Sequence, residues 1–254
     1  MSGHVVTETA AGVLTVRFNR PEKKNALLST MYAEAANALK AAAADASVRV
    51  AVMTGTADSF TAGNDLKDFL ENPPTDADAP VFRFMRTLAT FPKPVIAAVN
   101  GLAVGIGTTL LLHCDLAYAV PGAKFHLPFV NIAIVPEFAS TLLLPRLVGP
   151  ARAAELLLLG EPFTADKALS LGLINAIVAP EELMTVVAQK AAALAAKPPA
   201  ALRQAKALLR GNATEIAERI ALENQAVAER LSSAEFKEAA TAVFEKRAPD
   251  FSKF

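Results

Sequence analysis

The sequence predicts an α/β fold, in which helices pack on sheets. Two observations lead to this prediction. Through its first two thirds the chain alternates short apolar runs, which are typical of buried strands, with patterns that are typical of helices. Beyond residues 173–178 it carries only helical patterns to its end. No internal repeat or low-complexity tract interrupts this order beyond a general richness in alanine.

The expected strands are apolar and β-branched, and they end at turn residues. Residues 13–18 stop at Asn19-Arg20-Pro21, and residues 48–53 stop at Thr54-Gly55. Further runs of this kind lie at residues 94–99, 116–120 and 173–178.

Helical patterns fill most of the sequence between these runs. Residues 29–44 are alanine-rich, a second helix ends near residue 91, and residues 107–114 predict a short apolar helix. The three prolines of residues 71–80 predict a mobile surface loop.

In the last quarter of the chain, prolines and a glycine mark the helix boundaries. Pro180 and Pro199 are expected to open helices, and Gly211-Asn212 separates two of them. Ser232 and Glu235 have the spacing of a capping box before a last helix at residues 233–246. The apolar stripe of that helix must be buried on the main domain or on another subunit.

The composition excludes several classes of function. Twenty-five basic and 25 acidic residues give no net charge, which argues against a nucleic-acid partner. A single cysteine, Cys114, fits a reducing compartment. No secretory signal or membrane-spanning run is evident, so we expect a cytoplasmic protein without a membrane partner. The three histidines lack metal-ligand spacing, and we expect no metal.

Two glycine-bearing turns carry the strongest functional signal. The first is Ala62-Gly63-Asn64-Asp65 and the second is Gly105-Ile106-Gly107, and each separates a strand-like run from a helical pattern. Glycine lets a backbone N–H face a ligand without an intervening side chain. Two such N–H groups can converge on one oxygen and stabilise negative charge that develops on it.

Several landmarks resemble the crotonase (enoyl-CoA hydratase/isomerase) superfamily over essentially the whole chain. Besides the two turns, they are Asn19-Arg20-Pro21 with Asn25-Ala26-Leu27, Val99-Asn100-Gly101, Cys114-Asp115 and 160–165. The resemblance implies a crotonase-like spiral of ββα units at residues 1–196 and a C-terminal helical oligomerisation region at residues 197–254. It also implies a homotrimer or a hexamer built of two trimers, an acyl-CoA substrate, and no cofactor apart from the coenzyme A of that substrate.

Carried over by position, the resemblance also assigns site residues. The backbone N–H groups of Asn64 and Ile106 would form the oxyanion hole. Lys24 and Lys67 would meet the phosphates of coenzyme A, and Asp65 is expected chiefly to bind turn amides. The remaining substrate contacts would come from Ala26, Ala62, Leu66, Gly105 and Phe129.

One departure from the family pattern points to the reaction. Hydratases of this family hold a water between two glutamates, whose positions are taken here by Thr109 and Phe129, and neither side chain is a base near neutral pH. Glu137 lies where the peroxisomal-type Δ3,Δ2-enoyl-CoA isomerases carry a single glutamate. One carboxylate can move a proton from C2 to C4 of a 3-enoyl thioester, so the sequence favours that isomerisation.

Other interpretations stay open at this stage. The protein could be a hydratase that uses Glu137 with a different water geometry, another crotonase-type lyase or hydrolase, or a non-enzymatic acyl-CoA-binding protein. Glu137 could instead be a helix-start carboxylate, with Asp68 and Glu71 as reserve acids. Apolar neighbours would raise the pKa of Glu137 and a helix N-terminus would lower it, and the sequence does not say which prevails.

Overall fold

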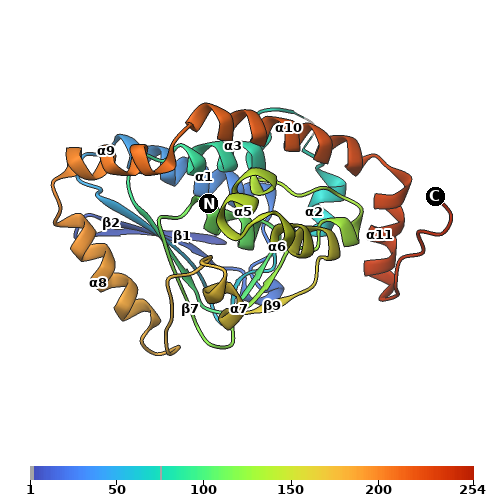
Figure 1. Ribbon diagram of the computed structural model, residues 1–254, viewed down its shortest axis with the longest axis horizontal. Helices are drawn as coiled ribbons and strands as arrows, with labels where there is room; N and C mark the ends of the chain where they lie inside the picture. Colours follow the sequence, from blue (N-terminus) through green and yellow to red (C-terminus); the bar gives the residue numbers. More distant parts are fainter. Residues whose placement is uncertain (1–2, 75) are drawn as a thin grey trace.

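Two sheets form the centre of the molecule in the computed structural model, which describes residues 3–74 and 76–254 (Figure 1). The larger sheet has the strand order β1-β2-β3-β5-β7-β10, and the smaller one has the order β4-β6-β8-β9. All neighbouring strands are parallel except the pairs β1–β2 and β8–β9. The strands are β1 (Val5–Ala10), β2 (Val13–Phe18), β3 (Val50–Gly55), β4 (Ser59–Thr61), β5 (Val95–Val99), β6 (Leu102–Val104), β7 (Leu116–Ala119), β8 (Lys124–His126), β9 (Phe163–Thr164) and β10 (Ala176–Ile177).

The chain builds both sheets at once, because successive strands alternate between them. β3, β5 and β7 belong to the larger sheet, and the strand that follows each of them, β4, β6 or β8, belongs to the smaller one. Helical segments lead from each of these pairs onward along the chain. This repeated strand–strand–helix order is the spiral of ββα units that the resemblance implied.

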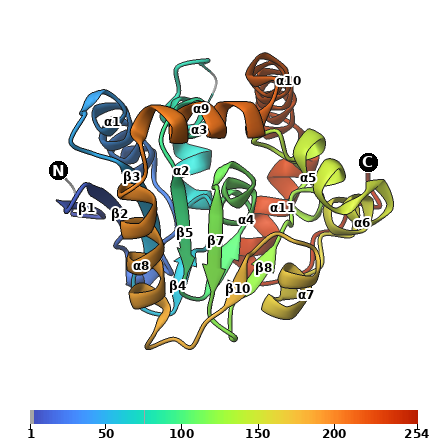
Figure 2. The same cartoon turned by 60° about the vertical axis from the view of Figure 1, so that its left-hand side comes forward.

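The helices of the spiral cover the sheets on both sides (Figure 2). Helix α1 packs on α3 and on the strands β1 and β2, whereas α8 packs on β3 and β5. The helical segments of this part are η1 (Pro21–Lys23), α1 (Ser29–Ala44), α2 (Leu66–Glu71), α3 (Pro80–Ala89), α4 (Ile106–Thr109), η2 (Leu110–His113), η3 (Val130–Ile132), α5 (Ser140–Val148), α6 (Pro150–Ala154), η4 (Glu155–Leu159), α7 (Ala165–Ser170) and α8 (Leu183–Ala195).

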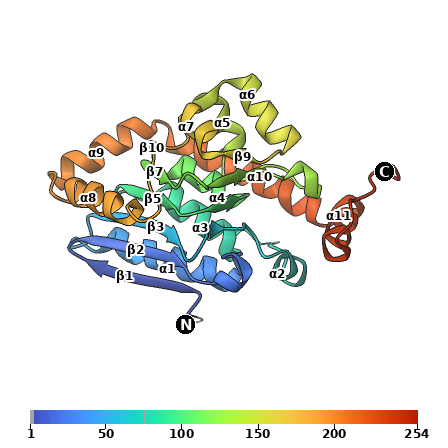
Figure 3. The ribbon, with the colours of Figure 1, turned by 90° about the horizontal axis from the view of Figure 1, so that it is seen from below.

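Three further helices end the chain, and the boundary between residues 196 and 197 falls in the connection that precedes them. They are α9 (Pro199–Arg210), α10 (Ala213–Leu231) and α11 (Ala234–Glu245). Helix α10 packs on α3 and α5, and α11 lies at the far end of the molecule from α8 and α9 (Figures 1 and 3). The apolar stripe of α11 is partly buried within its own chain, since Phe236 packs in a cluster with Phe69 and Phe129.

Most of the expected elements are present, and three expectations need correction. Helix α8 begins at Leu183 and not at Pro180. The cap of α11 is Ser233, whose side chain accepts from the Phe236 N–H, and not Ser232. The helix expected at residues 107–114 is one α-helical turn, α4, followed by the 3-10 turns of η2. The expected loop at residues 71–80 includes residue 75, which lies outside the described residues.

Candidate active site

The two glycine turns lie side by side because their strands are neighbours. β4 and β6 are parallel partners in the smaller sheet, so both strands end at the same edge. Close contacts there leave no room for a side chain. A Cβ on Gly63 would lie 2.9 Å from the Val104 carbonyl oxygen, and one on Gly107 would lie 2.6 Å from Thr61 Cγ2. Gly63 also has φ +87°, which disfavours any other residue.

Each turn presents one backbone donor that the protein does not use. Among the described residues, neither the Asn64 N–H nor the Ile106 N–H has an acceptor, whereas the N–H groups of Gly63 and Asp65 are bonded. Ile106 is the first residue of α4, where helix geometry leaves the N–H free. The two amides therefore form a candidate oxyanion hole. Since α4 is a single turn, the helix dipole adds little to it.

A buried tyrosine fixes one side of this hole. Tyr32 of α1 is 3% exposed, and its hydroxyl donates a hydrogen bond to Asn64 Oδ1. Burial raises the pKa of Tyr32 well above its usual value, and the nearby Glu137 and Asp68 carboxyls raise it further. Tyr32 therefore stays neutral as a donor, and it orients the residue whose amide faces the hole.

Asp65 caps α2, in agreement with its expected role. Its Oδ1 accepts from the N–H groups of Lys67 and Asp68, and its Oδ2 accepts from Arg20 Nη1 at 2.6 Å. Burial alone would raise the pKa of Asp65, but the Arg20 guanidinium and the turn amides lower it overall. Asp65 therefore fixes the turn as an ionised carboxylate.

A cavity of about 570 Å³ adjoins the Asn64 turn. It brings together six of the expected substrate-binding residues: Ala26, Ala62, Asn64, Asp65, Leu66 and Lys67. Lys24 does not line it. The Lys24 backbone is left-handed, with φ 50°, and its carbonyl accepts from the Ala62 N–H, while the preceding Lys23 lines the cavity together with Arg20.

The two other expected contact residues are Gly105, which is part of the second turn, and Phe129, which lies against it. Phe129 is 3% exposed, and its ring edge would be 3.9 Å from a Cβ on Gly105. Phe129 therefore supports the Gly105 turn from inside the protein. Helix α11, near the end of the chain, also contributes to the cavity beside the Asn64 turn, because Phe244 lines that cavity.

Glu137 is buried without a hydrogen-bond donor for one of its carboxyl oxygens. The side chain is 1% exposed, and Oε1 has no partner in the described part of the chain. Burial, together with the charge of Glu223, raises its pKa to about 8. The sequence left open whether apolar surroundings would raise the pKa of Glu137 or a helix N-terminus would lower it. The effect of burial therefore prevails.

A group of packed aromatic rings adjoins the Glu137 turn. The ring of the next residue, Phe138, stacks on His113 at 3.9 Å and lies 6.4 Å from Phe84, which in turn contacts Tyr32. His113 Nε2 donates to the Phe138 carbonyl at 2.7 Å, and burial lowers its pKa to about 3, so it is neutral. His113 therefore supplies no positive charge to Glu137.

The positions of the two hydratase glutamates hold no base. Thr109 is fully buried, and its hydroxyl has no partner among the described residues. Both reserve acids are engaged elsewhere. Asp68 accepts from the Ser29 N–H and from Asn72 Nδ2, and Glu71 is exposed and pairs with Lys67 at 3.7 Å.

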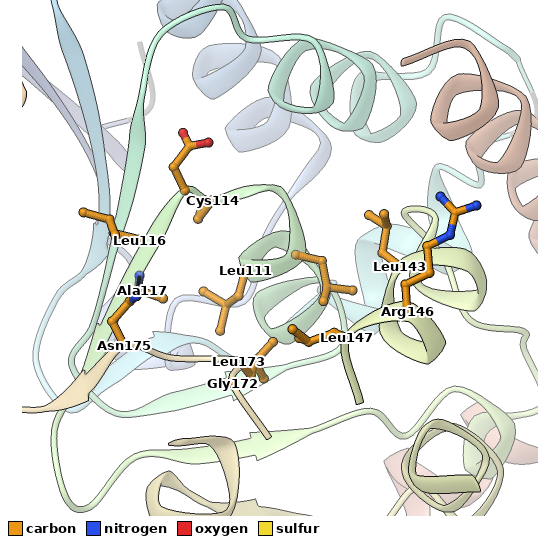
Figure 4. Close-up of a pocket in the computed structure, with 12 residues that line it drawn as sticks. Leu111, Cys114, Leu116, Ala117, Leu143, Arg146, Leu147, Gly172, Leu173 and Asn175 are labelled. Atoms are coloured by element: carbon orange, nitrogen blue, oxygen red, sulfur yellow. Dashed lines mark hydrogen bonds between the residues drawn. The ribbon is translucent and has the colours of Figure 1, made fainter. Parts of the chain in front are cut away.

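A separate cavity of about 360 Å³ contains none of the expected site residues (Figure 4). Leucines from η2 and α5 and the residues Gly172, Leu173 and Asn175 line it. Cys114 lies in its wall, where desolvation and the Asp115 carboxylate raise the pKa of the thiol to about 12. A thiol in this state is no nucleophile.

The sequence did not point to Tyr32, Lys23, Phe244 or Glu223. Tyr32 carries a usable signal, because it is a polar aromatic residue on the apolar face of an alanine-rich helix. Glu223 carries none, since its role depends on a contact across 84 positions of sequence.

Two general features accompany this site. Among the described residues, no helix is both long enough and apolar enough to cross a membrane. The described part of the chain also has no group of three or more histidine, cysteine, aspartate or glutamate side chains placed to hold a metal ion.

Known proteins resemble this chain along its whole length. The enoyl-CoA hydratase/isomerase family model matches residues 8–253. A solved enoyl-CoA hydratase/isomerase from Pseudoalteromonas atlantica T6c superposes with a TM-score of 0.94 at 40% identity, covering 98% of this chain and 100% of that one.

Curated relatives include both isomerases and hydratases. Human enoyl-CoA delta isomerase 2 is 39% identical over 81% of this chain, which spans about half (54%) of the human protein. Crotonyl-CoA hydratase of Syntrophomonas wolfei is 36% identical, over 98% of this chain and 97% of that protein. The relatives alone therefore do not separate the two reactions.

Proposed function

The chain belongs to the enoyl-CoA hydratase/isomerase family, and from that premise we propose that it converts 3-enoyl-CoA to 2-enoyl-CoA through a thioester enolate. The observation that carries this proposal is the buried carboxyl of Glu137, whose pKa is raised to about 8, while Thr109 and Phe129 replace the two glutamates of the hydratases. A base with a pKa near the working pH suits proton transfer in both directions.

The reaction needs one base and no water. The Glu137 carboxylate takes a proton from C2, and the electrons of the C2–H bond form a dienolate whose charge lies largely on the thioester oxygen. Glu137, now protonated, returns the proton to C4. The C3=C4 electrons form the new C4–H bond, the C1=C2 electrons of the dienolate become the C2=C3 double bond, and the oxygen electrons form the thioester carbonyl again, so atoms and charge balance.

The two glycine turns would stabilise the dienolate. The thioester oxygen would accept hydrogen bonds from the N–H groups of Asn64 and Ile106, which have no other acceptor among the described residues. Such donors stabilise a transition state by roughly 3–4 kcal/mol each, because they are already oriented when charge develops. The coenzyme A part would occupy the cavity beside Lys67 and Lys23.

Replacing Glu137 by Gln tests the proposal directly. The change keeps the volume of the side chain but removes the base, so we expect kcat for 3-enoyl-CoA to fall roughly 10³-fold while CoA-ester affinity stays within about twofold. The exposed Glu155→Gln variant is the control.

The measurement follows double-bond position and water addition, with 3-enoyl-CoA and 2-enoyl-CoA supplied separately. Rapid hydration of the 2-enoyl ester without isomerisation of the 3-enoyl ester would identify a hydratase and refute the proposal. Full activity of Glu137→Gln would place the base elsewhere.

A further inference from the structure

The turn that carries Glu137 has an unusual backbone. Phe138 and Ala139, the two residues that follow it, both have positive φ, 63° and 53°, although neither is glycine. Two consecutive left-handed residues with side chains persist only where their surroundings hold them. Helix α5 begins directly afterwards, at Ser140.

One side chain from the C-terminal region holds this turn. Glu223 lies in the middle of α10 and is 5% exposed. Its Oε2 accepts from the Ala139 N–H at 2.5 Å, and its Oε1 accepts from the N–H of Thr141 at 3.0 Å and from the Thr141 hydroxyl at 2.5 Å. Because both oxygens accept hydrogen bonds, the site fits an ionised carboxylate.

These bonds determine which donors Glu137 can reach. The free amides at the start of a helix normally stabilise a nearby carboxylate. Here Glu223 takes those of Ala139 and Thr141, and the Ser140 N–H bonds to the Glu137 carbonyl at 3.2 Å. Within the residues that the structure describes, Glu137 Oε1 is left without a partner.

The other ionisable groups around Glu137 do not replace this effect. Tyr32 from α1 is neutral and donates to Asn64, and His113 from η2 is neutral and donates to Phe138. Arg219 of α10 donates to the Thr141 hydroxyl, on the side of Glu223. Burial raises the pKa of Glu223 as well, but its three hydrogen bonds and Arg219 oppose that shift. The hydrogen bonds that Glu223 accepts therefore favour its ionised form, whereas Glu137 Oε1 receives none among the described residues.

We propose that Glu223 is a positioning residue for the base: it clamps the Phe138–Ala139 turn and takes the amides that would otherwise stabilise the Glu137 carboxylate. The inference rests on the proposed function, since it takes Glu137 as the base. The C-terminal helical region thereby contributes to proton transfer without touching the substrate.

The Glu223→Gln variant removes the clamp at constant volume. The two backbone amides bond to different oxygens of Glu223, and Gln replaces one of these oxygens by an NH2 donor, so one amide loses its acceptor; Gln also carries no charge. We expect kcat to fall at least about tenfold with KM within about twofold. The low-pH limb of kcat/KM should also move to lower pH by on the order of one unit, because Glu137 loses a like charge and gains donors. The control is Glu218→Gln, an exposed position of the same helix.

If Glu223 has only a structural role, Glu223→Gln will lower kcat and thermal stability but leave the low-pH limb of kcat/KM in place. That result would overturn the inference. If Glu223→Gln does not fold, Thr141→Val keeps the Thr141 N–H but removes the hydroxyl that donates to Glu223 and accepts from Arg219. That variant should move the limb in the same direction by a smaller amount, and an unmoved limb would again refute the clamp.

A second readout separates this inference from the proposed function. Infrared difference spectroscopy with ¹³C-labelled glutamate follows the protonation of Glu137 without turnover, and its band is assigned by its loss in Glu137→Gln. A titration midpoint of Glu137 that is lower in Glu223→Gln than in the wild type supports the clamp, and an equal midpoint refutes it. If Glu137→Gln is fully active, the proposed function fails, but this titration still decides the role of Glu223.

Discussion

At the scale of single residues, the site depends on which carboxyls find donors and which do not. Asp65 has three donors and stays ionised, whereas Glu137 Oε1 has none among residues 3–74 and 76–254, and the pKa of Glu137 rises to about 8. Both residues lie shortly before a helix, α2 or α5, so sequence context alone does not distinguish them. The difference comes from Glu223, which occupies the amides that Glu137 would otherwise use.

The raised pKa of Glu137 also predicts how stability depends on pH. In the unfolded chain the group titrates near 4.5, and in the folded protein near about 8. Between these values the folded state binds a proton that the unfolded state has released, so stability falls as pH rises, by up to ~1.4 kcal/mol per pH unit. Below about pH 4.5 the contribution is complete, and above about pH 8 it is lost.

Glu137→Gln cannot ionise and should lose this slope. Urea unfolding of both proteins at several pH values between about 5 and 7, at one protein concentration, measures the difference. The variant should gain stability relative to the wild type at each step upward in pH. Parallel pH dependences would contradict a raised pKa at this position.

At the scale of elements, sequence patterns predicted the long segments well and the short ones poorly. The bounds of α1 and β2 are those expected, because each has a full run of helix formers or of β-branched residues. β4, β6 and β8 have three residues each, too few for any periodicity. β1 is an edge strand, largely exposed and polar, and it lacks the apolar pattern of a buried strand. The smaller sheet was therefore not visible in the sequence, although the turns that it positions were.

Gly63 follows β4 and lies close to Val104 of β6, so a substitution at Gly63 tests the oxyanion hole. Ala at this position would place a Cβ 2.9 Å from the Val104 carbonyl oxygen on a backbone with φ +87°. The turn must shift, and the Asn64 N–H shifts with it. We expect kcat to fall ~10- to 100-fold, because displacements of about 1 Å have effects of this size.

Gly122→Ala is the matched control, since a Cβ there meets nothing within 4 Å. Steady-state kinetics with 3-enoyl-CoA and thermal unfolding of both variants provide the comparison. Wild-type kcat in a folded Gly63→Ala protein would exclude the Asn64 amide from the oxyanion hole.

At the scale of the whole molecule, the C-terminal region does more than the oligomerisation expected of it. Glu223 of α10 binds the turn of Glu137, and Phe244 of α11 lines the cavity beside Asn64. The trimer or hexamer stays a prediction; Leu208 and Leu209 of α9, at 76% and 88% exposed, are apolar positions that such an assembly could cover.

Phe244 tests whether α11 belongs to the substrate site of its own chain. Its ring lines the cavity while staying 56% exposed, so a bound CoA ester would cover part of it. Phe244→Ala should raise KM about 3- to 10-fold, equivalent to roughly 1 kcal/mol of lost apolar contact, and should leave kcat nearly unchanged because the Glu137 turn is not involved. The neighbouring Val243→Ala is the control, since Val243 is 52% exposed but does not line the cavity. Equal KM values for the two variants would mean that α11 contributes nothing to CoA-ester binding, and that its role is limited to burying Phe236 against Phe129.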